Sequence, residues 1–216
     1  LVLPIAVMAA YTFFTFVTAG VETSALTTAN WHEFLTDSYY SGFLLKTLRV
    51  GAMTAVLCGV LGYFPAYFIW ATTFKHKWLL LLLLIVPFWI CFTIRTFSWI
   101  NILGEQGVIN VALLKLGIIS EPLPMLYNEG AVILGMLHFL LPYMILNVYV
   151  SLEGIDRTLI SAARSMGCTS AQAFREVTLP LSLPGLAAGL LLCFVLAAGS
   201  YVTPQLLGSG RDALFG

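Results

Sequence analysis

Long runs of apolar residues alternate with short polar stretches along this chain of 216 residues. The hydrocarbon core of a bilayer is about 30 Å thick and requires about 20 mostly apolar residues for each spanning helix. Five runs approach or exceed that length, and they predict spans at about residues 1–18, 44–71, 78–99, 131–150 and 181–207. The first run has no charged leading region and no small-residue cleavage site, so we interpret it as a span and not as a signal peptide.

The polar stretches predict which segments lie outside the hydrocarbon. Residues 20–41 are polar and acidic, and a basic turn at residues 75–77 separates the second span from the third. Residues 108–116 form a short amphipathic pattern that Gly117 stops, which indicates a helix lying on the membrane surface. A further apolar segment begins after Arg211. Because five spans are an odd number, we expect a sixth span beyond it, missing at the C-terminus, and a longer parent protein.

Composition agrees with a membrane protein. Hydrophobic residues make up 60% of the chain and charged residues 9%, with a mean hydropathy of +0.95, so there is too little polar surface for a soluble globule. We therefore predict an all-α, polytopic membrane helix bundle, with a single domain over residues 1–216. The formal net charge of zero argues against a nucleic-acid partner, because binding to phosphates needs a basic surface.

Four cysteines stand singly and far apart in the sequence, without a C-x-x-C spacing. Metal sites gather their ligands and disulfides need partners. We interpret the four as packing residues, and no metal site or cofactor is predicted in this chain.

One polar segment, residues 153–180, lies between the fourth and fifth spans and predicts two short helices joined by a turn. Asp156 can cap a first helix that extends through Met166. Gly167 suits the left-handed position that ends such a helix. The basic residues of the polar segment favour the cytoplasmic side of the membrane.

The second short helix has its own boundary signals. Thr169 and Gln172 match a capping box, and we expect the helix to end near Leu179 because Pro180 has no amide hydrogen to continue it. An ordinary polar loop is the simplest alternative. A DNA-reading helix-turn-helix is disfavoured, because the polar segment is fused to spans on both sides and its charge is nearly balanced.

Ala162-Ala163, Gly167 and Leu179-Pro180 stand at the spacing of the EAA loop of binding-protein-dependent ABC importer permeases, and the chain resembles this family over nearly its whole length. Four further stretches resemble the spermidine/putrescine permeases, in particular the first permease of the two. They are Ile-Arg-Thr-Phe-Ser-Trp at 94–99, Glu-Pro-Leu-Pro at 121–124, Ser-Leu-Glu at 151–153 and Tyr-Val-Thr-Pro-Gln-Leu-Leu-Gly at 201–208.

The resemblance implies a six-helix permease of the type I ABC importer kind in the bacterial cytoplasmic (inner) membrane. It implies a second homologous permease, an extracytoplasmic substrate-binding protein and an ABC ATPase dimer as partners. The polar segment would couple the permease to that ATPase. The residues that carry this match are Ser161, Ala162, Ala163, Gly167, Val177, Leu179 and Pro180.

The chain departs from the family pattern at two positions. Ser161 replaces the leading Glu of the motif, which removes one charged contact but leaves the small residues and the glycine turn. Ser200 stands where polyamine-type relatives often carry an acidic residue. The sequence therefore offers no carboxylate for a cationic substrate at that place.

ATP chemistry is predicted to belong to a partner. The chain contains no G-x-x-x-x-G-K-[ST] motif, which cradles nucleotide phosphates, so ATP and Mg are expected on the ATPase. A membrane-embedded enzyme is a weak alternative, because only Arg95 and His138 are ionisable candidates within spans and they form no cluster in the sequence. A non-transporting membrane anchor or receptor subunit is the second alternative.

Polar and aromatic residues on three spans are candidates for a translocation path. They are Trp99, Tyr143, Asn147, Ser200, Tyr201 and Thr203. Aromatic faces can hold an organic cation by cation–π attraction. Arg95 near the outer end of its span is predicted to act as a gate or an interface anchor. A polyamine such as spermidine or putrescine, or a related amine, is the favoured small-molecule substrate, while an opine-like compound, a phosphonate and chelated iron stay open.

Overall fold

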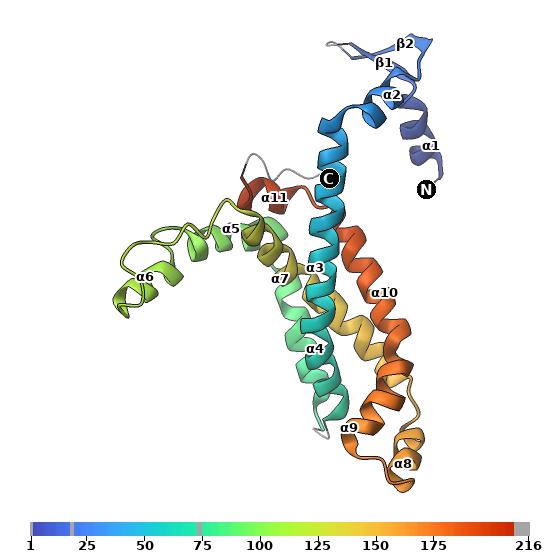
Figure 1. The fold of residues 1–216 in the computed structure, drawn as a ribbon, viewed down its shortest axis with the longest axis vertical. Coiled ribbons are helices and arrows are strands. Elements are labelled where there is room, and N and C mark those ends of the chain that lie inside the picture. The colour runs from blue at the N-terminus through green and yellow to red at the C-terminus, as the bar shows by residue number, and fades with distance from the viewer. Residues whose placement is uncertain (1, 18–19, 73–74, 210–216) are drawn as a thin grey trace. The chain divides into compact units, whose positions relative to one another are not determined.

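The computed structural model of the chain describes residues 2–17, 20–72 and 75–209 (Figure 1). The fold divides into two compact units, residues 1–46 and 47–216, where the sequence predicted a single domain. Helix α3 (Ser38–Ala71) contributes to both, because it begins in the first unit and continues through the second.

The first unit begins with a short helix and a hairpin, so the predicted span at residues 1–18 is wrong. Helix α1 (Val2–Tyr11) comes first. Strands β1 (Phe14–Val17) and β2 (Gly20–Leu26) then pair in antiparallel fashion. Residues 13–17 are all aromatic or β-branched and favour a strand, a preference that hydropathy alone does not reveal.

Helix α2 (Ala29–Thr36) is tied to the chain that precedes the hairpin. The Asn30 side chain donates from Nδ2 to the carbonyl oxygens of Thr12 at 3.0 Å and of Phe14 at 2.9 Å. Trp31 donates from Nε1 to Oγ1 of Thr12 at 3.2 Å. These bonds hold the end of α1 and the start of β1 against α2.

Three long helices form the body of the second unit: α3, α7 (Glu129–Glu153) and α10 (Leu179–Ala198). Met144 of α7 is fully buried where the three meet. A Cβ atom on Gly62 of α3 would lie 2.8 Å from Met144 Cγ, and one on Gly189 of α10 would lie 2.7 Å from Met144 Sδ. Glycine at these two positions thus lets both neighbouring helices approach α7 closely.

The predicted third span is broken into separate helices. α4 (Lys77–Ile85) passes into a 3₁₀ turn, η1 (Val86–Trp89), and α5 (Phe92–Leu103) follows. The two helical halves are bent by 90°. Pro87 lacks an amide hydrogen and Ile90 is extended, so no continuous helix crosses this point.

The helix predicted at residues 108–116 is present as α6 (Val108–Lys115), and Gly117 after it has φ +68°, while its place on the membrane surface stays a prediction. The predicted span at 181–207 is divided, because α10 ends at Ala198 and a short helix, α11 (Val202–Leu207), follows. The apolar segment expected after Arg211 lies outside the described residues.

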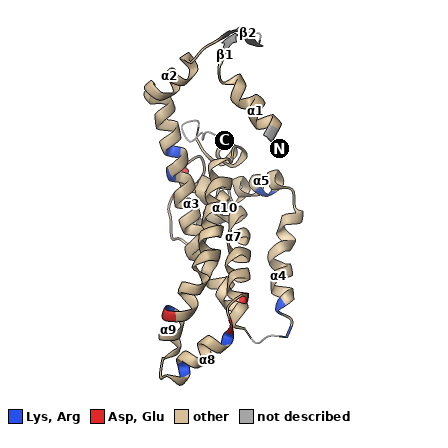
Figure 2. Ribbon diagram, turned by 90° about the vertical axis from the view of Figure 1, so that its right-hand side faces the viewer, with Lys and Arg blue, Asp and Glu red and all other residues tan. Residues whose placement is uncertain are grey.

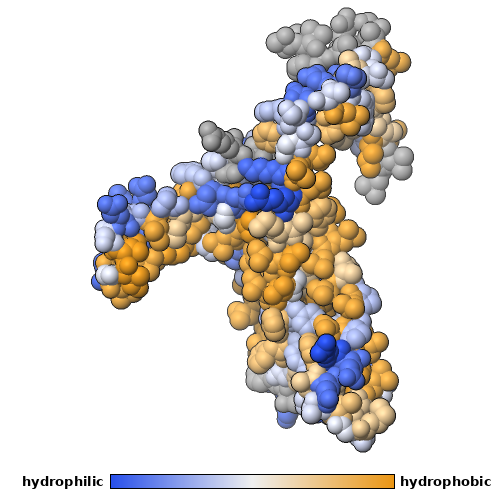
Figure 3. Space-filling view, in the orientation of Figure 1, coloured by the Kyte–Doolittle hydropathy of each residue, from blue (hydrophilic) through white to orange (hydrophobic). Residues whose placement is uncertain are grey.

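The second unit has the surface of a membrane protein. No Lys, Arg, Asp or Glu occurs at residues 50–72, 130–152 or 177–209, which Figure 2 shows as uncharged lengths of helix. Hydrophobic residues cover most of the visible surface of these helices in Figure 3. Among the described residues, three helices are long and apolar enough to cross a membrane, or four spans if the bent pair counts as one.

Candidate coupling site and translocation path

The first helix of the polar segment is α8 (Arg157–Ser165), and both of its predicted boundaries are confirmed. Asp156 Oδ1 accepts a hydrogen bond from the backbone N–H of Thr158 at 2.9 Å, and this bond lowers the pKa of the Asp156 carboxyl. At the other end, Gly167 has φ +94°. The N–H of Cys168 then bonds back to the carbonyl of Ala163 at 3.1 Å, the closure typical of a glycine-terminated helix.

The second short helix, α9 (Ser170–Ala173), has the predicted capping box. Gln172 Oε1 accepts from the Thr169 N–H at 2.8 Å, and the Gln172 N–H donates to Thr169 Oγ1 at 3.3 Å. The two turns on either side of Gly167 are thus fixed by local hydrogen bonds. Helices α8 and α9, with the turn at Gly167 between them, form an ordered unit that we call the elbow, and not a loose loop.

The expected end of this helix near Leu179 is wrong. α9 passes through a π-helical turn, η2 (Phe174–Thr178), directly into α10, so that Ser170–Ala198 is one continuous 29-residue helix. Pro180 directly follows the wider π turn, which changes the backbone hydrogen-bonding register there, so the helix continues through the proline. The elbow is therefore continuous with a long helix that packs on α7 in the bundle.

The seven predicted coupling residues lie on both sides of the turn at Gly167, on α8 and on the continuous helix that begins with α9. Ser161 and Ala162 are exposed on α8, Ala163 is buried, and Gly167 forms the turn. The other three, Val177, Leu179 and Pro180, lie at the junction of η2 and α10. The α8 arm also leaves two large apolar side chains uncovered, Leu159 at 47% and Met166 at 80% exposure.

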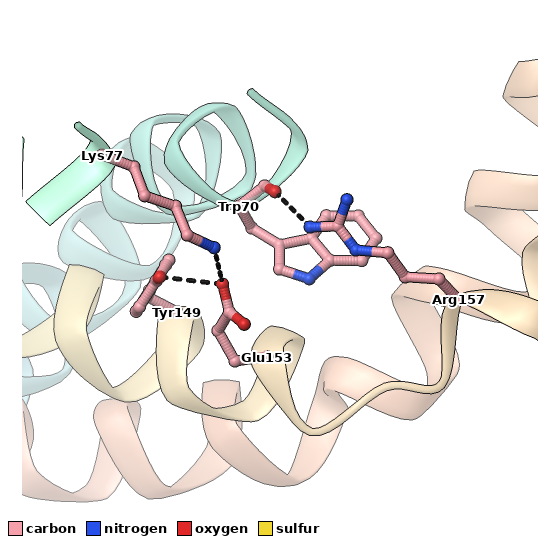
Figure 4. Close-up of polar contacts among 5 residues, drawn as sticks. All are labelled: Trp70, Lys77, Tyr149, Glu153 and Arg157. Atoms are coloured by element: carbon pink, nitrogen blue, oxygen red, sulfur yellow. Dashed lines mark hydrogen bonds and ion pairs between the residues drawn. The ribbon is translucent and has the colours of Figure 1, made fainter. Parts of the chain in front are cut away.

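Polar contacts at the start of the polar segment join it to α3 and α4 (Figure 4). Lys77 at the start of α4 pairs with Glu153 at the end of α7 at 2.5 Å, and Tyr149 donates to the same carboxylate at 2.8 Å. Arg157 donates from Nη2 to the carbonyl of Trp70 at 2.8 Å and lies 5.0 Å from the centre of the Trp70 ring. No local pattern predicts the Lys77–Glu153 and Arg157–Trp70 contacts, because their partners are separated by 76 and 87 residues.

An aromatic contact also links the π turn to α3. The Phe174 ring packs edge to face on Tyr67 and Tyr63, with centroids 5.0 Å and 6.0 Å apart. Such pairs are worth about 0.5–1.5 kcal/mol beyond their buried area. The π turn is thus coupled to α3 as well as to α10.

Arg95 lies inside the protein, although we expected it to extend toward the interface. It is 9% exposed and donates from Nη2 to the carbonyl of Ile90 at 3.0 Å. Its guanidinium carbon lies 5.5 Å from the Phe88 ring centre and 6.0 Å from that of Phe139. The break before α5 leaves the Ile90 carbonyl without a helical partner, and this carbonyl draws the side chain inward. Within the described chain, Arg95 Nε has no hydrogen-bond partner.

A largely apolar cavity of about 510 Å³ lies beside Arg95, between α4, α5 and α7. Trp99 and His138 form its polar wall, where Trp99 Nε1 donates to His138 Nδ1 at 3.4 Å. Tyr143 packs on the neighbouring Phe88 and Phe139 rings. Two of the six predicted path residues, Trp99 and Tyr143, therefore lie near the buried guanidinium.

The other four predicted path residues lie elsewhere. Asn147 donates from Nδ2 to the carbonyl of Tyr143 at 2.8 Å. Ser200 and Tyr201 form the link between α10 and α11, where Tyr201 is 57% exposed. Thr203 is buried, and a Cβ on Gly135 would lie 2.9 Å from its methyl carbon, so it packs α11 on α7. The six residues do not line one cavity in this structure.

The family described as "Binding-protein-dependent transport system inner membrane component" matches residues 1–215. The chain belongs to this family. It is 37% identical over 182 residues to the spermidine/putrescine transport system permease protein PotB of Escherichia coli, which is 84% of this chain and 66% of that protein. It is 30% identical over 200 residues to the inner membrane ABC transporter permease protein YdcU of Escherichia coli, which is 86% of this chain and 63% of that protein.

The chain spans about two thirds of the length of these curated relatives. Its fold matches a chain in the crystal structure of a bacterial ABC transporter involved in the import of the acidic polysaccharide alginate. The TM-score is 0.77 at 15% identity, over 97% of this chain and 73% of the other. The predicted resemblance and the helix bundle of an importer permease are confirmed, and the chain is a multi-pass inner membrane protein.

Proposed function

We propose that this chain is the permease subunit of an ABC importer, that it forms part of the path for a small solute, and that it couples to a separate ATPase through the polar segment. The observation that carries the proposal is the elbow of α8 and α9 around Gly167, which is rigidly capped and continuous with α10. An elbow joined to a spanning helix is suited to transmit a force from the aqueous phase into the bundle.

The face of α8 supplies the docking surface in this proposal. Leu159 and Met166 are exposed beside the small side chain of Ala162. Uncovered large apolar side chains on a short helix are typical of a helix that binds in a hydrophobic groove. Ser161 donates its hydroxyl to the carbonyl of Arg157 at 3.2 Å, so it adds no charge to that surface.

The proposed assembly contains an ABC ATPase dimer that holds ATP and Mg, a second homologous permease and an extracytoplasmic substrate-binding protein. The family description supports the last of these, because it names a binding-protein-dependent transport system. The solved alginate transporter was also crystallised in complex with a periplasmic protein bound to alginate pentasaccharide. The chain would supply the path and the coupling, and the ATPase the hydrolysis.

A polyamine or a related amine is the proposed substrate, and it is supported by the identity to PotB. The position of Arg95 limits where such a cation can pass. A guanidinium buried in the same cavity wall as Trp99 repels an ammonium group, since charges interact strongly away from water. The exposed ring of Tyr201 lies on the link after α10 and can attract an amine by about 0.5–2 kcal/mol.

The test is purification of the full-length protein from its native membrane in a mild detergent, followed by mass spectrometry of the proteins that accompany it. An ATPase, a second permease and a binding protein are expected. Reconstitution with these partners should then give ATP hydrolysis that rises when the binding protein carries spermidine. Reproducible recovery of no partner would contradict the proposal and favour a membrane anchor or receptor subunit.

A further inference from the structure

A polar cavity of about 260 Å³ lies between the end of α3 and the elbow. Arg157, Arg164 and Trp70 line it, and the hydroxyl residues in its wall are Tyr67, Ser161, Ser170 and Thr178. Pockets for drug-sized ligands usually measure about 300–1,000 Å³. This cavity is therefore suited to a small polar group.

Two guanidinium groups contribute positive charge to the cavity. Arg157 donates from Nη2 to the Trp70 carbonyl, and Arg164 donates from Nη2 to Ser170 Oγ at 3.3 Å. Both acceptors are neutral, and each guanidinium has five N–H donors in total. In the described part of the chain, neither arginine has a carboxylate within 4.0 Å.

The described acidic residues nearby form no ion pair with either arginine, although Lys77 first and Arg157 last lower the pKa of the Glu153 carboxyl. Glu153 is paired with Lys77, and Asp156 accepts the capping bond from Thr158. Glu176, on the π turn, is not among the residues that line the cavity. The cavity thus keeps two cationic side chains and the Ser170 hydroxyl proton as hydrogen-bond donors, whereas the Ser161 proton is already donated to the Arg157 carbonyl.

We propose that this cavity binds a phosphate group. Guanidinium groups match the geometry of phosphate oxygens and form strong charge-assisted bonds with them. Two sources share this chemistry, the headgroup of an anionic phospholipid and a free phosphate. The lipid source is favoured by position, because the cavity adjoins the ends of α3 and α8 where the apolar helix surface stops, and basic pockets at such ends bind lipid headgroups.

A phosphate in this cavity connects elements that the protein itself joins by few bonds. Arg157 lies at the start of α8 and Arg164 in its last turn, while Ser170 begins α9. Bonds to all three would hold the two arms of the elbow together beside α3. The inferred ligand thus stiffens the elbow without entering the translocation path.

The experiment uses the purified full-length transporter with Arg164→Gln as the test variant. Arg175→Gln is the matched control, because Arg175 is an exposed arginine of the same polar segment that does not line the cavity. Arg164→Lys keeps the positive charge but loses the planar guanidinium group, which can form two parallel hydrogen bonds to a phosphate. Size-exclusion chromatography confirms that each variant remains assembled, and Arg164→Lys carries the test if Arg164→Gln does not assemble.

Two arms distinguish the sources. In the first, native mass spectrometry measures phosphatidylglycerol retained from nanodiscs that also contain phosphatidylcholine. In the second, inorganic phosphate is titrated in a neutral detergent and followed by ³¹P NMR. The site is supported if binding in either measurement weakens at least tenfold in Arg164→Gln, severalfold in Arg164→Lys and less than twofold in Arg175→Gln. The measurement that shows this pattern identifies the source of the phosphate. Absence of binding in both arms, or equal losses in Arg164→Gln and Arg175→Gln, overturns it.

Discussion

Tyr63 of α3 and Ser182 of α10 meet through their hydroxyl oxygens, which lie 2.8 Å apart in the buried interior. Ser182 also donates its only hydroxyl proton to the carbonyl of Leu179 at 2.9 Å. Tyr63 must therefore be the donor in the pair. The bond links α3 to α10 close to η2, the π turn through which the elbow joins the bundle.

Tyr63→Phe should lower the free energy of unfolding by about 1 kcal/mol, because one buried hydrogen bond is lost while Ser182 keeps its other partner. Ser182→Ala should cost about 1–3 kcal/mol, since it leaves the buried Tyr63 hydroxyl unsatisfied. Thermal unfolding in detergent measures both. Tyr67→Phe is the control, and an equal loss in that variant would show that the Tyr63 bond contributes nothing specific.

Gly62→Ala should destabilise the protein by about 1–3 kcal/mol, because the added Cβ would lie 2.8 Å from Met144 Cγ in the core. Gly42→Ala in the same helix meets nothing within 4 Å and should be neutral or stabilising by up to about 1 kcal/mol. Comparison of the two melting temperatures tests the close contact of α3 with α7. Equal melting temperatures would contradict it.

Gly167→Val should reduce substrate-stimulated ATP hydrolysis in the assembled transporter. Its φ of +94° strains any β-branched side chain by about 1–3 kcal/mol, so the arms of the elbow would lose their alignment. Hydrolysis is measured in proteoliposomes with and without loaded binding protein. Gly154→Ala, at φ −73°, is the control and should retain stimulation. Normal stimulation of Gly167→Val would remove the elbow from the coupling mechanism.

Tyr201→Ala should impair uptake of radiolabelled spermidine while the complex still assembles, since it removes an exposed aromatic face at the link after α10. Tyr201→Phe keeps the ring and should transport at close to the normal rate. Uptake that is unchanged in Tyr201→Ala would exclude this residue from the path.

Local signals in the sequence predicted the elbow well. Asp156, Gly167 and the Thr169–Gln172 box act within one or two turns of backbone, so their bonds follow from residues nearby. The same kind of reasoning was wrong at Pro180. Whether a proline ends a helix depends on the preceding turn, and here a π turn places it at a tolerated position.

Composition and hydropathy by themselves determined that this is a helical membrane protein, and the spacing of small residues and prolines determined its family. Both conclusions depend only on residue types and on the order of neighbouring residues, which do not change with the way the chain packs. Only the tertiary structure decided that Arg95 lies inside, that Lys77 meets Glu153, and that Arg157 and Arg164 share a cavity. These relations join residues far apart in the chain, and they depend on how bent and continuous helices pack, which no local pattern specifies.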